Sequence, residues 1–190
     1  MTIMAKLIIG LVGQAGCGKG TATDILREQY GAGYYRFSAI LENILDQLAL
    51  DHTRENFTKL SEISRQTFGE DVLSYALEKQ AVTAQEDVVI VDGIRRLEDL
   101  AALEPLPHFK LIAIEVPVEV RYQRVIGRGE KAGEKNMTMK EFLEQEKFPT
   151  EVTIPAVMKR ATKTISNAGT RKEFEKEIHD MMKEFGFSKH

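Results

Sequence analysis

A chain of 190 residues with a net charge of −3 is long enough to bury the core of one domain, so we expect a single domain over residues 1–190. Its slight acidity, with a pI near 5.9, argues against an extended nucleic-acid surface, and its single cysteine excludes an internal disulfide. The charge therefore predicts a small molecule as the partner. The first apolar run covers only residues 7–12, too short for a membrane span or a signal-peptide core, so we expect a cytoplasmic protein that binds no membrane.

Five short apolar runs predict β-strands at residues 7–12, 34–37, 88–91, 111–116 and 164–166. Helical periodicity appears between or after them, for example at residues 21–30, 39–50 and 171–185. Strands that alternate with helices favour a parallel sheet covered on both faces, so we expect a three-layer α/β fold with five strands. Ligands of such folds gather at the carboxyl ends of the strands.

The first predicted strand runs directly into a glycine-rich segment that is typical of a phosphate-binding loop. Its residues are Gly13, Gln14, Ala15, Gly16, Cys17, Gly18, Lys19, Gly20 and Thr21. Glycines let the backbone fold tightly so that successive N–H groups point inward, and the following helix adds the positive end of its dipole. Lys19 would lie between the outer phosphates of a polyphosphate, with the Thr21 hydroxyl nearby. An ordinary turn explains two of these glycines but not four in this arrangement.

The spacing G-x-x-G-x-G-K-G-T resembles the phosphate loop of adenylate-kinase-like nucleoside monophosphate kinases, with Ala15 in place of their usual proline. The resemblance implies a P-loop kinase fold that uses ATP with Mg²⁺. Gly20 stands where the strict P-loop pattern carries a magnesium-binding hydroxyl, and Thr21 follows one residue late. In those kinases magnesium is held largely through water and the phosphates, which implies the same for Thr21. Cys17 is either a small residue that fits the loop or a thiol made reactive by the helix N-terminus.

A second cluster of charged residues follows the third predicted strand. Asp92 and Gly93 are followed by Arg95 and Arg96, so an acid that can bind magnesium stands beside two groups that can hold a phosphate. The segment resembles the Asp-Gly-x-Pro-Arg element of adenylate kinases, with Arg95 at the proline position and Arg96 at that of the phosphate-binding arginine. Which arginine binds the phosphate stays open. In the alternative interpretation, Asp92 caps a helix at residues 94–103 and the arginines are solvated.

Arginines recur at spacings of three and four after the fourth predicted strand, at Arg121, Arg124 and Arg128, and therefore share one helical face. The pattern resembles the first lid element of adenylate kinases, which implies that Arg124 lies near the ATP base and that Arg128 reaches the transferring phosphate. We expect a lid over residues 124–146, with a polar, mobile loop at 129–136 and a helix at 138–147 that returns to the core. The alternative is a solvated basic helix face.

The acceptor side is expected in the helices between residues 38 and 85. Ser38 follows the second predicted strand, where monophosphate kinases carry a Ser or Thr beside the monophosphate. Glu42 occupies roughly the place where an arginine is expected, and an acid there does not hold a phosphate. Arg54 or Arg65 would supply the missing cation, although a surface salt bridge explains either residue equally well.

Asn167 and Gly169 form a turn between the last predicted strand and the last helix. The turn resembles the closing segment of nucleoside monophosphate kinases and dephospho-CoA kinases, which implies that both residues back the ATP adenine. An ordinary strand-turn-helix with Thr170 as the N-cap explains the same pattern.

Together these motifs predict a kinase that transfers the γ-phosphoryl group of ATP to a nucleoside or deoxynucleoside monophosphate. Lys19, Asp92, Arg124 and Arg128 would act on the reacting phosphates, and Ser38, Arg65, Arg95 and Arg96 would hold the acceptor. Dephospho-CoA kinase is an alternative, with Asp24 or Asp92 as the base for its hydroxyl acceptor. A regulatory NTPase that signals to a protein or ribonucleoprotein partner is another. The sequence leaves the base, the sugar and the oligomeric state open.

Overall fold

A computed structural model describes residues 5–129 and 134–189. Its centre is a parallel five-stranded sheet in the order β2-β3-β1-β4-β5. The strands are β1 (Leu7–Val12), β2 (Gly33–Arg36), β3 (Val88–Asp92), β4 (Phe109–Glu115) and β5 (Lys163–Ser166). The predicted sheet is confirmed, because each strand overlaps one of the five apolar runs.

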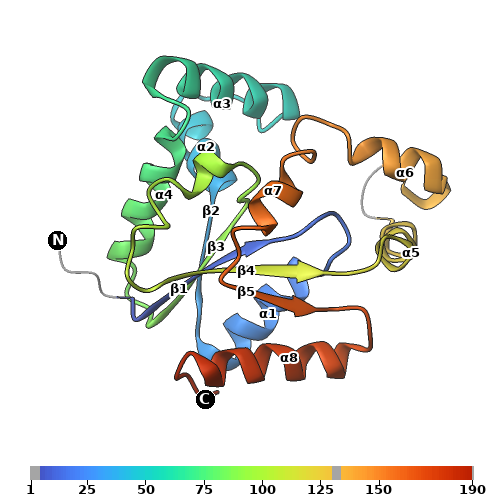
Figure 1. Cartoon of the computed structure of the whole chain (residues 1–190). Helices are drawn as coiled ribbons and strands as arrows, with labels where there is room; N and C mark the ends of the chain where they lie inside the picture. The colour runs from blue at the N-terminus through green and yellow to red at the C-terminus, as the bar shows by residue number, and fades with distance from the viewer. Residues whose placement is uncertain (1–4, 130–133, 190) are drawn as a thin grey trace.

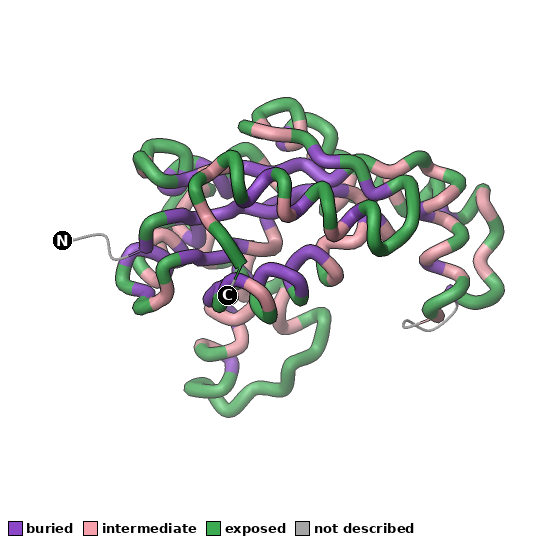
Figure 2. The backbone as a smooth tube through the Cα atoms, turned by 90° about the horizontal axis from the view of Figure 1, so that it is seen from below, coloured by how far each residue is buried: buried purple, intermediate pink, exposed green. Residues whose placement is uncertain are grey.

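Side chains of the strands alternate between two hydrophobic cores, one on each face of the sheet. In β1, Ile8 and Val12 join one core, whereas Leu7, Ile9 and Leu11 join the other. The first core is covered by α2 (Phe37–Gln47), α4 (Val72–Thr83) and α7 (Ile154–Met158), and the second by α1 (Lys19–Tyr30) and α8 (Arg171–Glu184). Figure 2 shows the buried centre between more exposed layers. The three-layer α/β architecture is therefore confirmed.

Local signals explain where several helices begin. The Thr170 hydroxyl accepts a hydrogen bond from the N–H of Glu173 at the start of α8, and Thr138 and Glu141 form the same capping box at the start of α6 (Met139–Gln145). The helix considered at residues 94–103 does not form. Only a short 3₁₀ turn, η1 (Leu97–Leu100), occurs there, because the backbone of Arg96 is extended, with φ −124° and ψ 156°, so that no helix can run through this residue.

The remaining helices lie toward the two ends of the carboxyl edge of the sheet (Figure 1). In the expected acceptor region, α3 (Arg54–Phe68) packs on α2 and α4. In the expected lid, α5 (Val118–Arg128) is followed by the short η2 (Glu134–Asn136) and α6. Part of the loop expected to be mobile, residues 130–133, lies outside the described residues. None of the helices seen in the described residues is both long and apolar enough to cross a membrane.

Candidate functional site

The glycine-rich loop forms a cradle between the end of β1 and the start of α1. Gly16 and Gly18 have φ angles of 78° and 98°, a left-handed backbone that favours glycine. The side-chain ammonium of Lys19 folds back over the loop and donates to Gly13 O, 3.8 Å from the sulfur of Cys17. Because α1 begins at Lys19, the N–H groups of its first turn and the positive end of the helix dipole lie close to the charge of the lysine. This geometry suits a bound polyphosphate.

Cys17 is buried, with 1% of its surface exposed. A Cβ atom on Gly13 would lie 2.6 Å from its sulfur, so the thiol fills the space that the missing side chain leaves. Reactive thiols are at least partly exposed, and the burial of Cys17 favours its interpretation as a small residue that fits the loop.

Three residues expected at the ATP base lie together beside this loop. Asn167 donates from Nδ2 to Cys17 O at 2.8 Å. Arg124 lies within 3.4 Å of Asn167 Oδ1 and 3.5 Å of Gly169 O through its Nη2 atom. Its other terminal nitrogen, Nη1, is buried and has no hydrogen-bond partner among the described residues. A buried N–H group without an acceptor is costly, and a nucleotide bound here would supply one.

Arg128 ends α5, four residues and therefore about 6 Å along the helix axis beyond Arg124. Its Nη2 lies 3.4 Å from Oε1 of the buried Glu134, while its own side chain is 37% exposed. The residue thus lies on the part of α5 that leads into the expected lid.

Asp92 ends β3 beside the phosphate loop, since β3 pairs directly with β1. Its carboxylate accepts from Tyr34 Oη at 2.8 Å and from its neighbour's N–H, Gly93 N, at 2.7 Å. Partial burial, together with the hydrogen bond and charge of Asp92, raises the pKa of Tyr34. The tyrosine therefore stays a donor that orients the acid. The alternative interpretation, in which Asp92 caps a helix at residues 94–103, is wrong, because η1 begins five residues after Asp92.

The residues at this edge fit a magnesium ion carried by a nucleotide. Mg²⁺ usually keeps several waters and binds one or two carboxylates together with phosphates, and Asp92 with the Thr21 hydroxyl supplies such oxygen atoms. No cluster of three or more His, Cys, Asp or Glu residues suited to a metal occurs in the described part of the chain. A bound Mg²⁺ would neutralise charge on the phosphates.

Three arginines expected at the acceptor lie near the end of β3, each paired with an acid. Arg65 Nη2 lies 2.9 Å from Asp99 Oδ1 in a buried pair. Arg96 lies 2.6 Å from Glu70 and 3.4 Å from Glu98. Burial lowers the pKa of Arg96, but the hydrogen bond and charge of Glu70, together with the charges of Glu98 and Asp99, outweigh that effect, so the pKa is raised. The guanidinium group therefore stays charged.

Arg95 bridges to the segment before α7. It pairs with Glu151 through Nη1, and the same atom donates to Thr150 O at 3.2 Å. Its own carbonyl accepts from the Thr153 hydroxyl at 2.7 Å. The end of β3 is thus tied to a segment more than fifty residues later.

Ser38 is the second residue of α2 and lies close to the end of β3, because Phe37 packs on Gly93. Glu42 pairs with Arg36 at 2.8 Å, so the acid at the expected arginine position has its own partner. Arg54 lies at the opposite end of α3 from Arg65, about 16 Å away along the axis, and does not join the acceptor arginines.

Two residues of this region were absent from the expected site. Arg121 is buried on α5 and donates to Ala15 O in the phosphate loop, and Glu146, just after α6, accepts from Gln14 Nε2 at 2.9 Å. The spacing of the arginines on α5 pointed to Arg121, but the sequence carried no signal for Glu146.

Comparison with known proteins shows relatives in archaea. The chain is 26% identical over 177 residues to the UPF0200 protein of Hyperthermus butylicus, covering 93% of this chain and 94% of the relative. It is 27% identical over 186 residues to the UPF0200 protein TK1334 of Thermococcus kodakarensis, covering 94% and 97%.

Solved structures show the same fold. A shikimate kinase from Bacteroides thetaiotaomicron aligns with a TM-score of 0.62 at 16% identity, over 95% of this chain and 99% of that chain. A sugar kinase from Janibacter sp. HTCC2649 aligns with a TM-score of 0.54 at 15% identity, over 94% and 93%. The predicted P-loop kinase fold is confirmed.

A family model described as an AAA domain, AAA_17, matches residues 12–142. That span is more than half of the chain and includes the phosphate loop, the end of β3 and all of α5. The chain therefore belongs to the AAA domain family that this model describes.

Proposed function

We propose that this protein transfers the γ-phosphoryl group of ATP to a nucleoside or deoxynucleoside monophosphate. The observation that carries the proposal is the placement of Arg95 and Arg96, with Ser38, at the end of β3, next to the loop that follows β1. A phosphate-binding cradle and a second cationic cluster on adjacent strand ends are what transfer between two phosphates requires.

The donor side would use the phosphate loop, Lys19 and the residues around Arg124. The Nη1 atom of Arg124, which has no hydrogen-bond partner within residues 5–129 and 134–189, supports a nucleotide contact at this position. Asn167 and Gly169 would back the adenine. A phosphate acceptor is already a nucleophile, so the reaction needs positioned charges rather than a strong base.

On the acceptor side, the exposed pairs are the ones that a phosphate can open. Arg95 and Arg96 have side chains that are 45% and 36% exposed, and exposed ion pairs contribute little stability. A phosphate dianion would replace their carboxylate partners. The buried pair of Arg65 with Asp99 would stay closed, because Asp99 also accepts both backbone N–H groups of the two arginines. Arg65 would therefore stabilise the acceptor site through Asp99, which holds the backbone of Arg95 and Arg96.

A hydroxyl acceptor such as dephospho-CoA is a second candidate, favoured by Asp92. The Asp92 carboxylate lies at the end of β3, close in the chain to Arg95 and Arg96, and accepts a hydrogen bond from Tyr34. This bond orients the carboxylate, as a base for a hydroxyl requires. Asp24, the other acid considered for this role, is exposed one turn into α1.

The test is an ATP-consumption screen with Mg²⁺ across ribonucleoside monophosphates, deoxynucleoside monophosphates and dephospho-CoA. We expect ADP formation that depends on one or a few monophosphates and disappears in Lys19→Ala. Turnover with dephospho-CoA alone would select the second candidate. Hydrolysis at the same rate with and without every acceptor would contradict both.

Lysine substitutions test the acceptor arginines. Arg95→Lys and Arg96→Lys should each raise the acceptor KM about tenfold or more, because lysine cannot reproduce the bidentate, charge-assisted bonds of a guanidinium to phosphate. The KM for ATP should change little.

Arg160→Lys is the matched control, since Arg160 makes a two-bond pair with Glu104 on the surface and should leave both constants unchanged. A normal acceptor KM in both Arg95→Lys and Arg96→Lys would place the acceptor elsewhere.

A further inference from the structure

A buried arginine connects α5 to the phosphate loop. Arg121 is 4% exposed, which is rare for a charged side chain unless it is paired. Its Nε donates to Val116 O at 3.2 Å, and its Nη1 donates to Ala15 O at 3.3 Å and to Glu146. One guanidinium group therefore contacts the backbone before its own helix, the phosphate loop and the end of α6.

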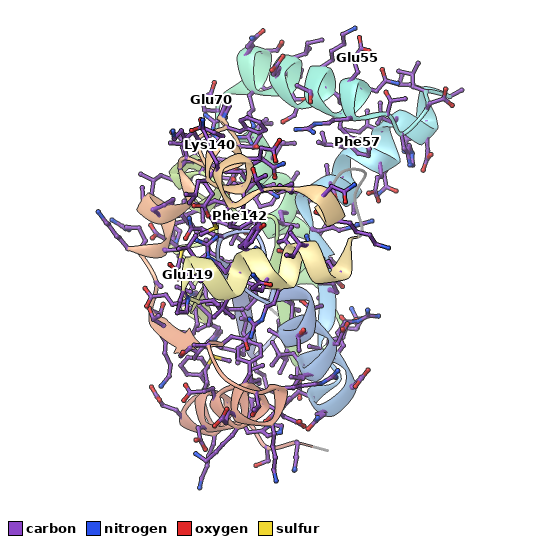
Figure 3. The ribbon with its side chains drawn as sticks, turned by 90° about the vertical axis from the view of Figure 1, so that its right-hand side faces the viewer. Glu55, Phe57, Glu70, Glu119, Lys140 and Phe142 are labelled. Atoms are coloured by element: carbon purple, nitrogen blue, oxygen red, sulfur yellow. The ribbon has the colours of Figure 1, made fainter. Side chains whose placement is uncertain are left out.

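Glu146 links Arg121 to a second residue of the phosphate loop, Gln14. Its Oε1 accepts from Arg121 and from Gln14 Nε2, the latter at 2.9 Å. Phe142, on the side of α6 that faces α5 (Figure 3), places its ring centre 5.6 Å from the Arg121 guanidinium carbon. Two residues of the loop, Gln14 and Ala15, are thus joined to α5 and to Glu146 at the end of α6.

The contact with Ala15 O controls the direction of a donor in the loop. In a planar trans peptide the C=O of one residue and the N–H of the next point in opposite directions. Gly16 lies against α5, since a Cβ atom on it would be 2.6 Å from Arg121 O. Holding Ala15 O toward Arg121 therefore turns the Gly16 N–H away from α5 and fixes the direction of this donor.

We propose that Arg121, held by Glu146, is a positioning residue that preorganises the phosphate loop for ATP. The proposal rests on the proposed function in so far as the ligand is ATP. A loop that already has its N–H groups aimed loses less entropy on binding. Glu146 follows α6, so its contacts with Arg121 and Gln14 attach the C-terminal end of the expected lid to the phosphate loop. Movement of that end would therefore change the conformation of the loop.

Glu146→Ala tests the role of the acid. Without it Arg121 loses its charged partner and Gln14 loses its acceptor, so amide hydrogen exchange at residues 13–18 should become faster in the unliganded protein. ATP should bind about tenfold more weakly, as expected for the loss of a hydrogen bond to a charged group. Glu144→Ala is the matched control, because Glu144 lies two residues earlier in an exposed pair with Lys147. It should change neither quantity.

A double variant separates positioning from stability. Replacing a buried ion pair by apolar residues often restores stability, so Arg121→Met combined with Glu146→Leu should unfold near the wild-type temperature. Its ATP affinity should stay about tenfold lower and its loop exchange fast, because nothing holds Ala15 O. Recovery of affinity together with stability would show that the pair is only structural and would overturn the proposal.

The measurements also distinguish this proposal from the proposed function. If the wild-type protein does not bind ATP, the proposed function fails. Amide hydrogen exchange at residues 13–18 in the unliganded variants still tests whether Arg121 and Glu146 hold the loop. Unchanged amide exchange at residues 13–18 in both the single and the double variant would overturn the positioning role of Arg121, even if the protein is an active ATP-dependent enzyme.

Discussion

Lys19→Ala is expected to abolish phosphoryl transfer, lowering kcat/KM by at least about a hundredfold, the scale of one lost transition-state charge contact. Lys19 begins α1 and folds over the loop, where it donates to Gly13 O, a neutral carbonyl, and lies 3.8 Å from the sulfur of Cys17. The ammonium charge is therefore available to the phosphates of a ligand. The substitution removes no buried apolar side chain, so the melting temperature of the unliganded protein should change little.

Thermal unfolding with and without Mg²⁺ and ATP checks the same prediction without an acceptor. ATP should stabilise the wild-type protein by RT ln(1 + [L]/Kd), about 2.7 kcal/mol at a hundred times Kd, and should leave Lys19→Ala almost unshifted. Lys6→Ala is the control, since Lys6 pairs with Asp87 on the surface at the start of β1. Wild-type turnover in Lys19→Ala would exclude the loop as the phosphate site.

Arg128→Ala is expected to lower kcat by about a hundredfold or more while ATP affinity falls less than about threefold. An arginine that meets the transferring phosphate only when a lid closes acts on the transition state, and such contacts are worth large factors in kcat. Its exposed position at the end of α5 and its contact with Glu134 are compatible with such a movement.

Arg124→Ala provides the comparison on the same helix. Because Arg124 lies beside Asn167 and Gly169, its loss should mainly weaken ATP binding, as measured by calorimetry. Equal losses of kcat and affinity in Arg128→Ala would place Arg128 in ground-state binding instead.

Much of the fold was predictable because its signals are local. Each strand is a run of apolar residues bounded by turns, and alternation of strands with helices leaves few topologies. The start of α8 was predictable from Thr170, which the structure confirms as its N-cap. The helix considered at 94–103 was wrong, because the extended backbone of Arg96 interrupts it and only the 3₁₀ turn η1 follows, and periodicity alone does not reveal such an interruption.

The acceptor region was less predictable, because its charges are balanced by distant residues. Arg65 pairs with Asp99, 34 residues later, and Arg95 pairs with Glu151, 56 residues later. From the sequence, each arginine could equally be a solvated charge or a phosphate ligand. The tertiary structure shows that the two side chains differ in burial: that of Arg65 is 11% exposed, whereas that of Arg95 is 45% exposed.

The amino-acid sequence by itself determined the phosphate loop, since the glycines and Lys19 act through backbone geometry within nine consecutive residues. It also determined the five strands and the order of the charged clusters along the chain. Only the tertiary structure decided what braces the loop. Gln14 meets Glu146 across 132 residues, and Arg121 of α5 is buried against the phosphate loop, Glu146 and the ring of Phe142. A side chain's burial and partner depend on which layers meet in space, and no local pattern carries that information.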